Sequence, residues 1–268
     1  METTALQTRL SPQIQELELE QFVLQLEVDG LCVVPPEKTG VPPETIKAIA
    51  ERLLFEAEEV VGCGFDLNKG PKAELTMSAD ENVIAQFSGD RGEPTQFLVQ
   101  QLCARDRLFR DLAINPIGVA LIRHLIGQNA TRFSSHNAFI KWQGEFGYGQ
   151  NLGLHCDQIA VPRPWGRNAL TANTNWCITD YSLDGGALAY VPGSHRRMEP
   201  PRFPEAVELA VPVEAPAGSL IVFHGATWHG AFPRLTEGMR LSIANYFRHY
   251  MVLPQDDIKN LFPQELAE

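Results

Sequence analysis

The sequence predicts a mainly β fold with flanking α-helices, in which a double-stranded β-helix, or jelly-roll, forms the core and amino-terminal helices pack outside it. Helical spacing of apolar residues dominates the first half of the chain, whereas short apolar or alternating runs bounded by Gly and Pro fill the second half. The 268 residues suit one large domain, because all-β barrels and sandwiches often reach about 200–250 residues undivided. We therefore expect a single domain over 1–268, with a helical part at about 1–130, a jelly-roll core at about 131–252 and a tail at 253–268.

The amino-terminal part is expected to be helical apart from one short strand. Pro43 begins its segment at an early helical position, where proline is favoured. The Asp29-Gly30 pair predicts a turn before a strand at Leu31–Val34. Gly62–Gly92 has no clear period, and we expect a mobile loop over the site there. The predicted helices are Ser11–Val28, Pro43–Glu59, Thr95–Leu112 and Ile117–Ile126.

The carboxy-terminal part is expected to consist of short strands. Their number fits a double-stranded β-helix, a jelly-roll architecture. The predicted strands are Arg132–Gln143, Gly153–Gln158, Ala172–Tyr181, Ala187–Val191, Ala210–Val213, Ser219–His224 and Arg240–Tyr250.

Composition excludes several classes of function. A net charge of −11 argues against a nucleic-acid or anionic-membrane binder, which would show basic clusters. The sequence has no apolar stretch of about 18 residues, and 1–11 has no signal-like apolar core. Five scattered cysteines fit neither a disulfide scaffold nor a zinc ribbon. We therefore expect a cytoplasmic protein, monomeric or homodimeric, whose partner is a small molecule.

The strongest chemical signal is a possible metal site formed by His155, Asp157 and His229. Ligands at i and i+2 project from one face of an extended strand, and a distant histidine completes a 2-His-1-carboxylate set. This set leaves metal positions open, as non-haem Fe(II) requires when it binds O2 and a co-substrate. A His-x-Asp pair alone is usually an ordinary polar pair. Its partners further along the chain favour the metal.

Arg240 supplies the second signal, eleven residues after His229. If 233–238 forms a hairpin turn, His229 and Arg240 lie opposite each other on neighbouring strands, with Cβ atoms about 4.5–5.5 Å apart. The planar guanidinium binds carboxylates bidentately, and Ser242 shares its strand face. The pattern therefore predicts a chelating keto acid beside the metal.

In these motifs and their order, the chain resembles the phytanoyl-CoA dioxygenase (PhyH) family over roughly residues 17–252. The segments that carry the resemblance are Leu154-His155-Cys156-Asp157, Asp184-Gly185-Gly186-Ala187, Val191-Pro192-Gly193-Ser194-His195, Trp228-His229-Gly230 and Arg240-Leu241-Ser242. Many relatives have Thr where this chain has Leu188, and Gln where it has Gly153.

The resemblance implies a set of roles for these residues. His155, Asp157 and His229 correspond to the iron ligands, and Arg240 to the partner of the distal 2-oxoglutarate carboxylate. Asn137 and Trp176 occupy positions where relatives line the co-substrate pocket.

The resemblance also implies a reaction. Fe(II), 2-oxoglutarate and O2 would oxidise a C–H bond of a small specialised metabolite, releasing succinate and CO2, with ascorbate helpful in vitro. An intact carboxylate at Asp157 favours hydroxylation over halogenation. Desaturation, epimerisation, rearrangement or acyl-CoA hydroxylation would use the same site. A zinc metallohydrolase and a non-catalytic metal-binding jelly-roll protein are the alternatives of other classes.

Other chemistry-bearing residues have a structural interpretation that is at least as good as a functional one. We expect His195 and His224 to be structural, and Cys156, between two ligands, to point into the core. Four basic residues could meet an anionic substrate or simply be solvated, namely Lys141, Arg196, Arg197 and Arg202. Four aromatic residues could form a substrate wall or ordinary packing, namely Phe146, Tyr148, Trp165 and Phe203.

Overall fold

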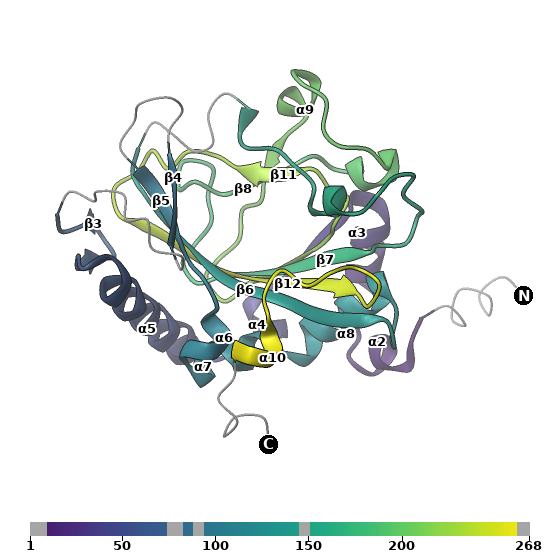
Figure 1. Cartoon of the computed structure of the whole chain (residues 1–268), viewed down its shortest axis with the longest axis horizontal. Helices are drawn as coiled ribbons and strands as arrows, with labels where there is room; N and C mark the ends of the chain where they lie inside the picture. Colours follow the sequence, from purple (N-terminus) through teal and green to yellow (C-terminus); the bar gives the residue numbers. More distant parts are fainter. Residues whose placement is uncertain (1–9, 74–82, 88–93, 145–150, 262–268) are drawn as a thin grey trace, which may run out of the picture.

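The computed structural model describes residues 10–73, 83–87, 94–144 and 151–261 (Figure 1). Two antiparallel sheets face each other and form the predicted jelly-roll. The large sheet has seven strands in the order β1, β10, β7, β12, β6, β5, β4, and the small sheet has three in the order β11, β8, β9. The cavity that carries the candidate site lies between them.

The bounds of the large sheet agree well with the predicted strands. Its members are β1 (Leu31–Val34), β4 (Val83–Phe87), β5 (Pro94–Val99), β6 (Thr131–Trp142), β7 (Thr171–Cys177), β10 (Leu220–His224) and β12 (Met239–His249). The small sheet contains β8 (Leu188–Tyr190), β9 (Val211–Pro212) and β11 (His229–Ala231). The predicted loop Gly62–Gly92 contains a separate strand pair, β2 (Phe65–Asp66) and β3 (Gly70–Pro71), as well as β4 of the large sheet, while 74–82 and 88–92 fall outside the described residues.

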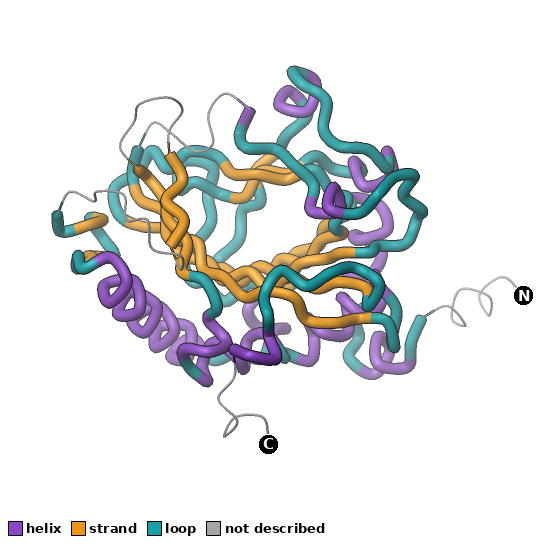
Figure 2. The backbone as a smooth tube through the Cα atoms, in the orientation of Figure 1, coloured by secondary structure: helices purple, strands orange, loops and turns teal. Residues whose placement is uncertain are grey.

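Helices cover the outer face of the large sheet, as the tube in Figure 2 shows. They are α2 (Pro12–Glu16), α3 (Glu20–Asp29), α4 (Pro36–Thr39), α5 (Pro43–Val61), α6 (Leu102–Arg105), α7 (Arg107–Ala113) and α8 (Pro116–Ile126). Their apolar faces and the outward residues of the sheet, such as Ile140, Leu241 and Ile243, form one buried core. Shorter helical turns are η3 (Asp157–Ala160), η4 (Ser194–Arg197), α9 (Glu205–Glu208) and α10 (Ile258–Leu261). No helix in the described part of the chain is both long and apolar enough to cross a membrane.

Three predicted elements were wrong. The helix expected over Ser11–Val28 is broken at Glu18, whose φ of 52° lies in the left-handed region and ends the helical path. The helix expected over Thr95–Leu112 begins as strand β5 and becomes helical only at Leu102. The strand expected over Gly153–Gln158 is a loop that forms one bridge, His155 to His229, and then turns into η3.

Candidate metal and co-substrate site

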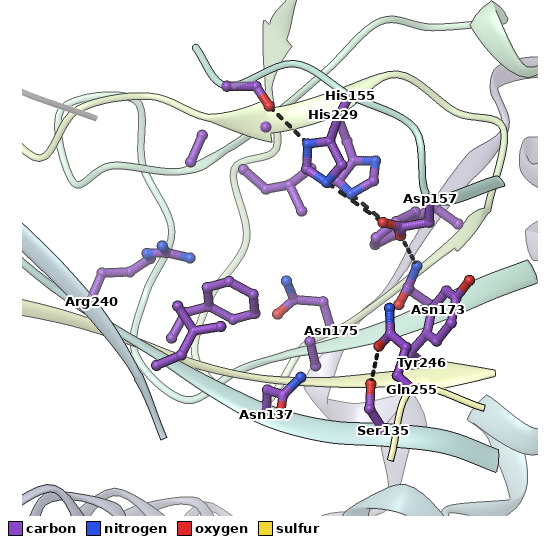
Figure 3. A pocket seen from close by; sticks show the side chains of 18 residues that line it. Ser135, Asn137, His155, Asp157, Asn173, Asn175, His229, Arg240, Tyr246 and Gln255 are labelled. Atoms are coloured by element: carbon purple, nitrogen blue, oxygen red, sulfur yellow. Dashed lines mark hydrogen bonds and ion pairs between the residues drawn. The ribbon is translucent and has the colours of Figure 1, made fainter. Parts of the chain in front are cut away.

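The structure brings His155, Asp157 and His229 together (Figure 3). One ligand atom from each lies within 4.8 Å of the others. Asp157 Oδ1 is 3.5 Å from His155 Nε2, and its Oδ2 is 3.6 Å from His229 Nε2. The backbone bridge between residues 155 and 229 is what joins the two histidines, because each N–H donates to the other residue's carbonyl.

Hydrogen bonds fix the tautomer of both imidazoles. Nδ1 of His155 lies 2.8 Å from the Gly153 carbonyl, and Nδ1 of His229 lies 3.0 Å from the Thr227 carbonyl. A carbonyl only accepts, so each Nδ1 must carry the proton. Both Nε2 atoms then face Asp157 and are the atoms that would bind a metal, and an Nδ1–H bonded to a carbonyl is the arrangement that histidine ligands of metals adopt.

The carboxylate of Asp157 is held ready as an anion. Its burial alone would raise its pKa, but His229, His155 and a hydrogen bond from Asn173 Nδ2 outweigh that effect and hold the pKa at about 2. Burial and the neighbouring His155 lower the pKa of His229 to about 4, so this imidazole is neutral at pH 7. For His155, burial would lower the pKa, but the hydrogen bond and charge of Asp157 outweigh burial and raise it.

This donor set fits Fe(II). Two neutral imidazoles and one carboxylate on one side of an ion are the facial triad of non-haem iron oxygenases, and they leave further positions open. Asn173 supports the carboxylate in the way that residues behind metal ligands usually do. Zinc accepts the same donor types, so geometry alone does not distinguish the two metals.

A cavity of about 380 Å³ extends from the triad between the two sheets. Alternate residues of each large-sheet strand point into it, while the intervening residues point to the helices. From β12 these are Arg240, Ala244 and Tyr246, and from β6 Ser135, Asn137 and Phe139. Strand β7 contributes Asn173 and Asn175.

Arg240 lines this cavity at a distance from the triad, on the opposite side of the view in Figure 3. Its side chain is buried, with 3% of its surface exposed. Nη1 donates to Tyr181 Oη at 2.8 Å and to Ser242 Oγ at 3.3 Å, and Nη2 donates to Gln96 Oε1 at 3.3 Å. Its Nε has no partner, and no carboxylate among the described residues pairs with the guanidinium. The charged residues nearest to Arg240 are basic, because burial and the charge of Arg240 both lower the pKa values of Lys141 and Arg234. A buried cation without an anionic neighbour favours an anionic ligand, since an unpaired buried charge is costly.

The hairpin expected between His229 and Arg240 was wrong. β11 pairs with β8 in the small sheet, whereas β12 pairs with β6 and β7 in the large sheet. The segment between them crosses from one sheet to the other, so His229 and Arg240 face each other across the cavity. Ser242 follows on the same face of β12 and contacts Arg240.

The prediction for Trp176 was also wrong. Its side chain is fully buried among the helices, and its indole N–H donates to the Leu112 carbonyl of α7. The cavity-lining residues of this strand are Asn173 and Asn175, the latter one position earlier than Trp176. Asn137 does line the cavity, as expected. Sequence reasoning missed Asn173, Asn175, Tyr181 and Gln255.

The structure agrees with the structural roles expected for His195, His224 and Cys156. His195 and His224 lie with ring centroids 5.4 Å apart, away from the triad, and Cys156 packs in an apolar cluster. Lys141 is buried and donates to the Phe232 carbonyl at 2.7 Å. Trp165 is buried and donates to the Val161 carbonyl.

The surface arginines contact protein groups. Arg196 donates to the Val28 carbonyl, Arg197 pairs with Glu205, and Arg202 pairs with Glu199. Phe203 is 46% exposed and does not line the cavity. Phe146 and Tyr148 lie outside the described residues.

Comparison with known proteins places these features in a family context. A family model described as phytanoyl-CoA dioxygenase (PhyH) matches residues 26–242. "Dioxygenase af480" of Aspergillus fumigatus is 31% identical over 178 residues, which are 65% of this chain and 56% of that protein. The match therefore spans little more than half of that relative. "Dioxygenase aneA" of Aspergillus aculeatus is 27% identical over 217 residues, which are 74% of this chain and 71% of that protein.

Solved structures share the fold. The epimerase SnoN in complex with Fe3+, alpha-ketoglutarate and nogalamycin RO is 19% identical, covers 94% of this chain and 91% of its own, and gives a TM-score of 0.63. HygX from Streptomyces hygroscopicus with nickel and 2-oxoglutarate bound is 17% identical, covers 85% of this chain and 86% of its own, and gives a TM-score of 0.60. At these identities the likeness shows the fold, a jelly-roll shared with 2-oxoglutarate-dependent enzymes.

Proposed function

The chain belongs to the phytanoyl-CoA dioxygenase (PhyH) family, and we propose that it is an Fe(II)- and 2-oxoglutarate-dependent dioxygenase that hydroxylates a C–H bond of a small organic substrate. The observation that carries this proposal is one cavity with a 2-His-1-carboxylate set near one end and a buried arginine without a carboxylate partner at the other. A metal-chelating keto acid with a second carboxylate matches both ends at once.

Each residue has a defined task in this proposal. His155, Asp157 and His229 would hold Fe(II), while Arg240 would bind the distal carboxylate of 2-oxoglutarate with help from Ser242 and Tyr181. When bound, the metal and co-substrate would supply the oxidation, in which O2 is reduced while 2-oxoglutarate becomes succinate and CO2. The protein determines which substrate carbon lies within reach.

Asn137 lines the cavity between these two ends, and we keep it as a proposed co-substrate contact. Its Oδ1 is buried without a hydrogen-bond partner. All oxygens of 2-oxoglutarate are acceptors, so its contact would be with the Nδ2 donor of Asn137.

Other reactions also fit the same site. The solved epimerase SnoN and the carbocyclase SnoK, which is 17% identical with a TM-score of 0.60, show that the fold is compatible with reactions other than hydroxylation. Desaturation, epimerisation and ring closure therefore remain alternatives, as does an acyl-CoA substrate. A non-catalytic binding protein is disfavoured, because it gives Arg240 no reason to lie buried opposite a metal site.

We also infer a cytoplasmic location for a protein that acts on small molecules as a monomer or homodimer. All five cysteines are buried and free, which fits a reducing compartment, where Fe(II) also persists.

The decisive experiment measures succinate formation by the purified protein with Fe(II), 2-oxoglutarate, O2 and ascorbate. We expect basal succinate formation that depends on added Fe(II), together with one bound metal ion per chain. His229→Ala should abolish both, whereas His124→Ala, at a partly buried histidine of α8 that contacts Glu27, should change neither. Succinate formation in His229→Ala equal to that of the wild type would overturn the assignment, and zinc-dependent hydrolysis without O2 would replace it.

A further inference from the structure

The cavity is longer than the proposed co-substrate requires. Arg240 and Tyr246 both point into it from β12, six residues apart. At about 3.4 Å per residue they lie roughly 20 Å from each other along the strand. A five-carbon dicarboxylate anchored at Arg240 and chelated at the triad leaves the part around Tyr246 free. We call this part the amide chamber, formed by Ser135, Asn173, Tyr246 and Gln255.

The amide chamber is polar but uncharged. Among all described residues that line the cavity, the only ionisable groups besides the Tyr246 phenol are the triad and Arg240. A substrate that entered the chamber with a phosphate, carboxylate or ammonium group would find no opposite charge there. Such an uncompensated charge is expensive in a partly desolvated site.

The amides of the chamber keep part of their hydrogen-bonding capacity unused. Asn173 donates to Asp157 through Nδ2, which leaves its Oδ1 as a free acceptor. Gln255 accepts from Ser135 Oγ through Oε1 at 2.5 Å, and no described residue accepts from its Nε2. The chamber thus offers both donors and acceptors.

Gln255 comes from the carboxy-terminal tail, which was expected to lie outside the core. After β12 the chain folds back along β6, where the backbone N–H groups of Gln255 and Asp256 donate to Ser134 Oγ and the Ser134 carbonyl, both at 3.0 Å. These bonds hold the tail independently of the Gln255 side chain. The amide is therefore fixed at the chamber, beside Ser135 (Figure 3).

We propose that Gln255 is a specificity-determining residue whose Nε2 donates to a neutral oxygen of the substrate, and that the substrate enters the amide chamber as an uncharged, hydroxyl- or carbonyl-bearing molecule. This inference rests on the proposed dioxygenase function. It predicts that an acyl-CoA thioester, with its phosphates, and a free amino acid, with its two charges, are poor substrates.

The substrate class is tested by a panel read as stimulation of succinate formation over the basal rate. The panel contains three groups: neutral hydroxylated terpenoids and polyketide lactones, acyl-CoA thioesters, and amino or carboxylic acids. We expect stimulation only in the neutral group. Stimulation by either charged group, or none by any neutral compound, overturns the inference. Because the basal Fe(II)-dependent rate is measured in the same assay, its absence would instead reject the dioxygenase function.

The role of Gln255 is tested with the best neutral compound. Gln255→Ala should raise its KM about fivefold, as expected for one neutral hydrogen bond, and leave 2-oxoglutarate affinity unchanged. Gln255→Glu keeps an oxygen for Ser135 but loses the Nε2 donor, so it should be at least as impaired as Gln255→Ala. Gln128→Ala, an exposed glutamine after α8, is the matched control. Wild-type KM in Gln255→Glu would show that the side chain only tethers the tail, and would overturn the donor role.

Discussion

Arg240→Ala is the sharpest test of the co-substrate site. Arg240 is 3% exposed, and its guanidinium donates three hydrogen bonds to neutral side chains of the described residues. A bound carboxylate would therefore be its first anionic partner. Removing one partner of a buried, hydrogen-bonded charge pair costs about 2–5 kcal/mol. At 1.4 kcal/mol per tenfold, affinity for 2-oxoglutarate should fall by about thirtyfold or more.

Arg240→Lys refines the same test. Lysine keeps the positive charge but loses the planar fork that binds a carboxylate through two parallel bonds. Its affinity for 2-oxoglutarate should therefore lie between those of the wild type and Arg240→Ala. Arg107→Ala, at an arginine that is 83% exposed on α7, is the control and should bind 2-oxoglutarate like the wild type.

The assay is an anaerobic titration of the Fe(II)-loaded protein with 2-oxoglutarate, followed by calorimetry and by the absorption of the metal chelate. Metal binding should survive in Arg240→Ala, because the triad lies on other elements, namely β11, the loop before η3 and the first residue of η3. An unchanged dissociation constant for 2-oxoglutarate would refute the reasoning. So would loss of the metal alone, since the two ends of the cavity would then not be separable.

Four further predictions concern the surroundings of the site. Tyr181→Phe removes the hydroxyl that contacts Arg240 Nη1 at 2.8 Å, and titration should show a loss of about twofold to tenfold in 2-oxoglutarate affinity. Asn173→Ala removes the hydrogen bond to Asp157 and should weaken Fe(II) binding about 10–100-fold in a chelator competition, while exposed Asn129→Ala should not. Burial lowers the pKa of His136 from 6.5 to about 3, so below pH 6.5 the unfolded chain takes up a proton that the folded chain does not. As the pH falls from about 6.5 toward 3, the free energy of unfolding measured in urea should decrease by about 1.4 kcal/mol per pH unit because of this group. The decrease should be smaller in His136→Phe. Wild-type product formed in excess chloride should carry oxygen from labelled O2 and no chlorine by mass spectrometry, because the Asp157 carboxylate occupies the position that a halide would need.

Much of the fold could be predicted from local pattern. β1 was predicted exactly as observed, and β6 and β12 within a residue at most ends, because apolar runs bounded by turn residues indicate strands. β5 was missed because its short run continues into α6 and α7 without a Gly or Pro between them. A short apolar run at the start of a helical pattern is compatible with either structure. Only its pairing with β6 decides the matter.

The face on which each side chain lies could be predicted less well. All seven residues of β7 are buried, so hydrophobic alternation does not show which face meets the helices and which meets the cavity. Trp176 was assigned to the cavity from the family resemblance alone, and the strand pattern gave no signal that Asn175 lies there instead. A strand covered on both faces loses the period-2 signal that an exposed face provides. Gln255 could not be found at all, because its place depends on contacts with Ser134 and Ser135, about 120 residues earlier.

The predicted hairpin was wrong, yet His229 and Arg240 do line the same cavity. Strand register explains why. In β12, Arg240, Ser242 and Ala244 share one face, and the pairing with β6 and β7 fixes that face toward the small sheet. A slip of one residue would turn Leu241 and Ile243 into the cavity and Arg240 into the apolar core, at the cost of a buried charge. The apolar core beneath the sheet therefore holds Arg240 in place as firmly as its own hydrogen bonds do. His229 is held separately, by β8 and the bridge to His155, so the two ends of the cavity are positioned by two sheets that need no direct contact.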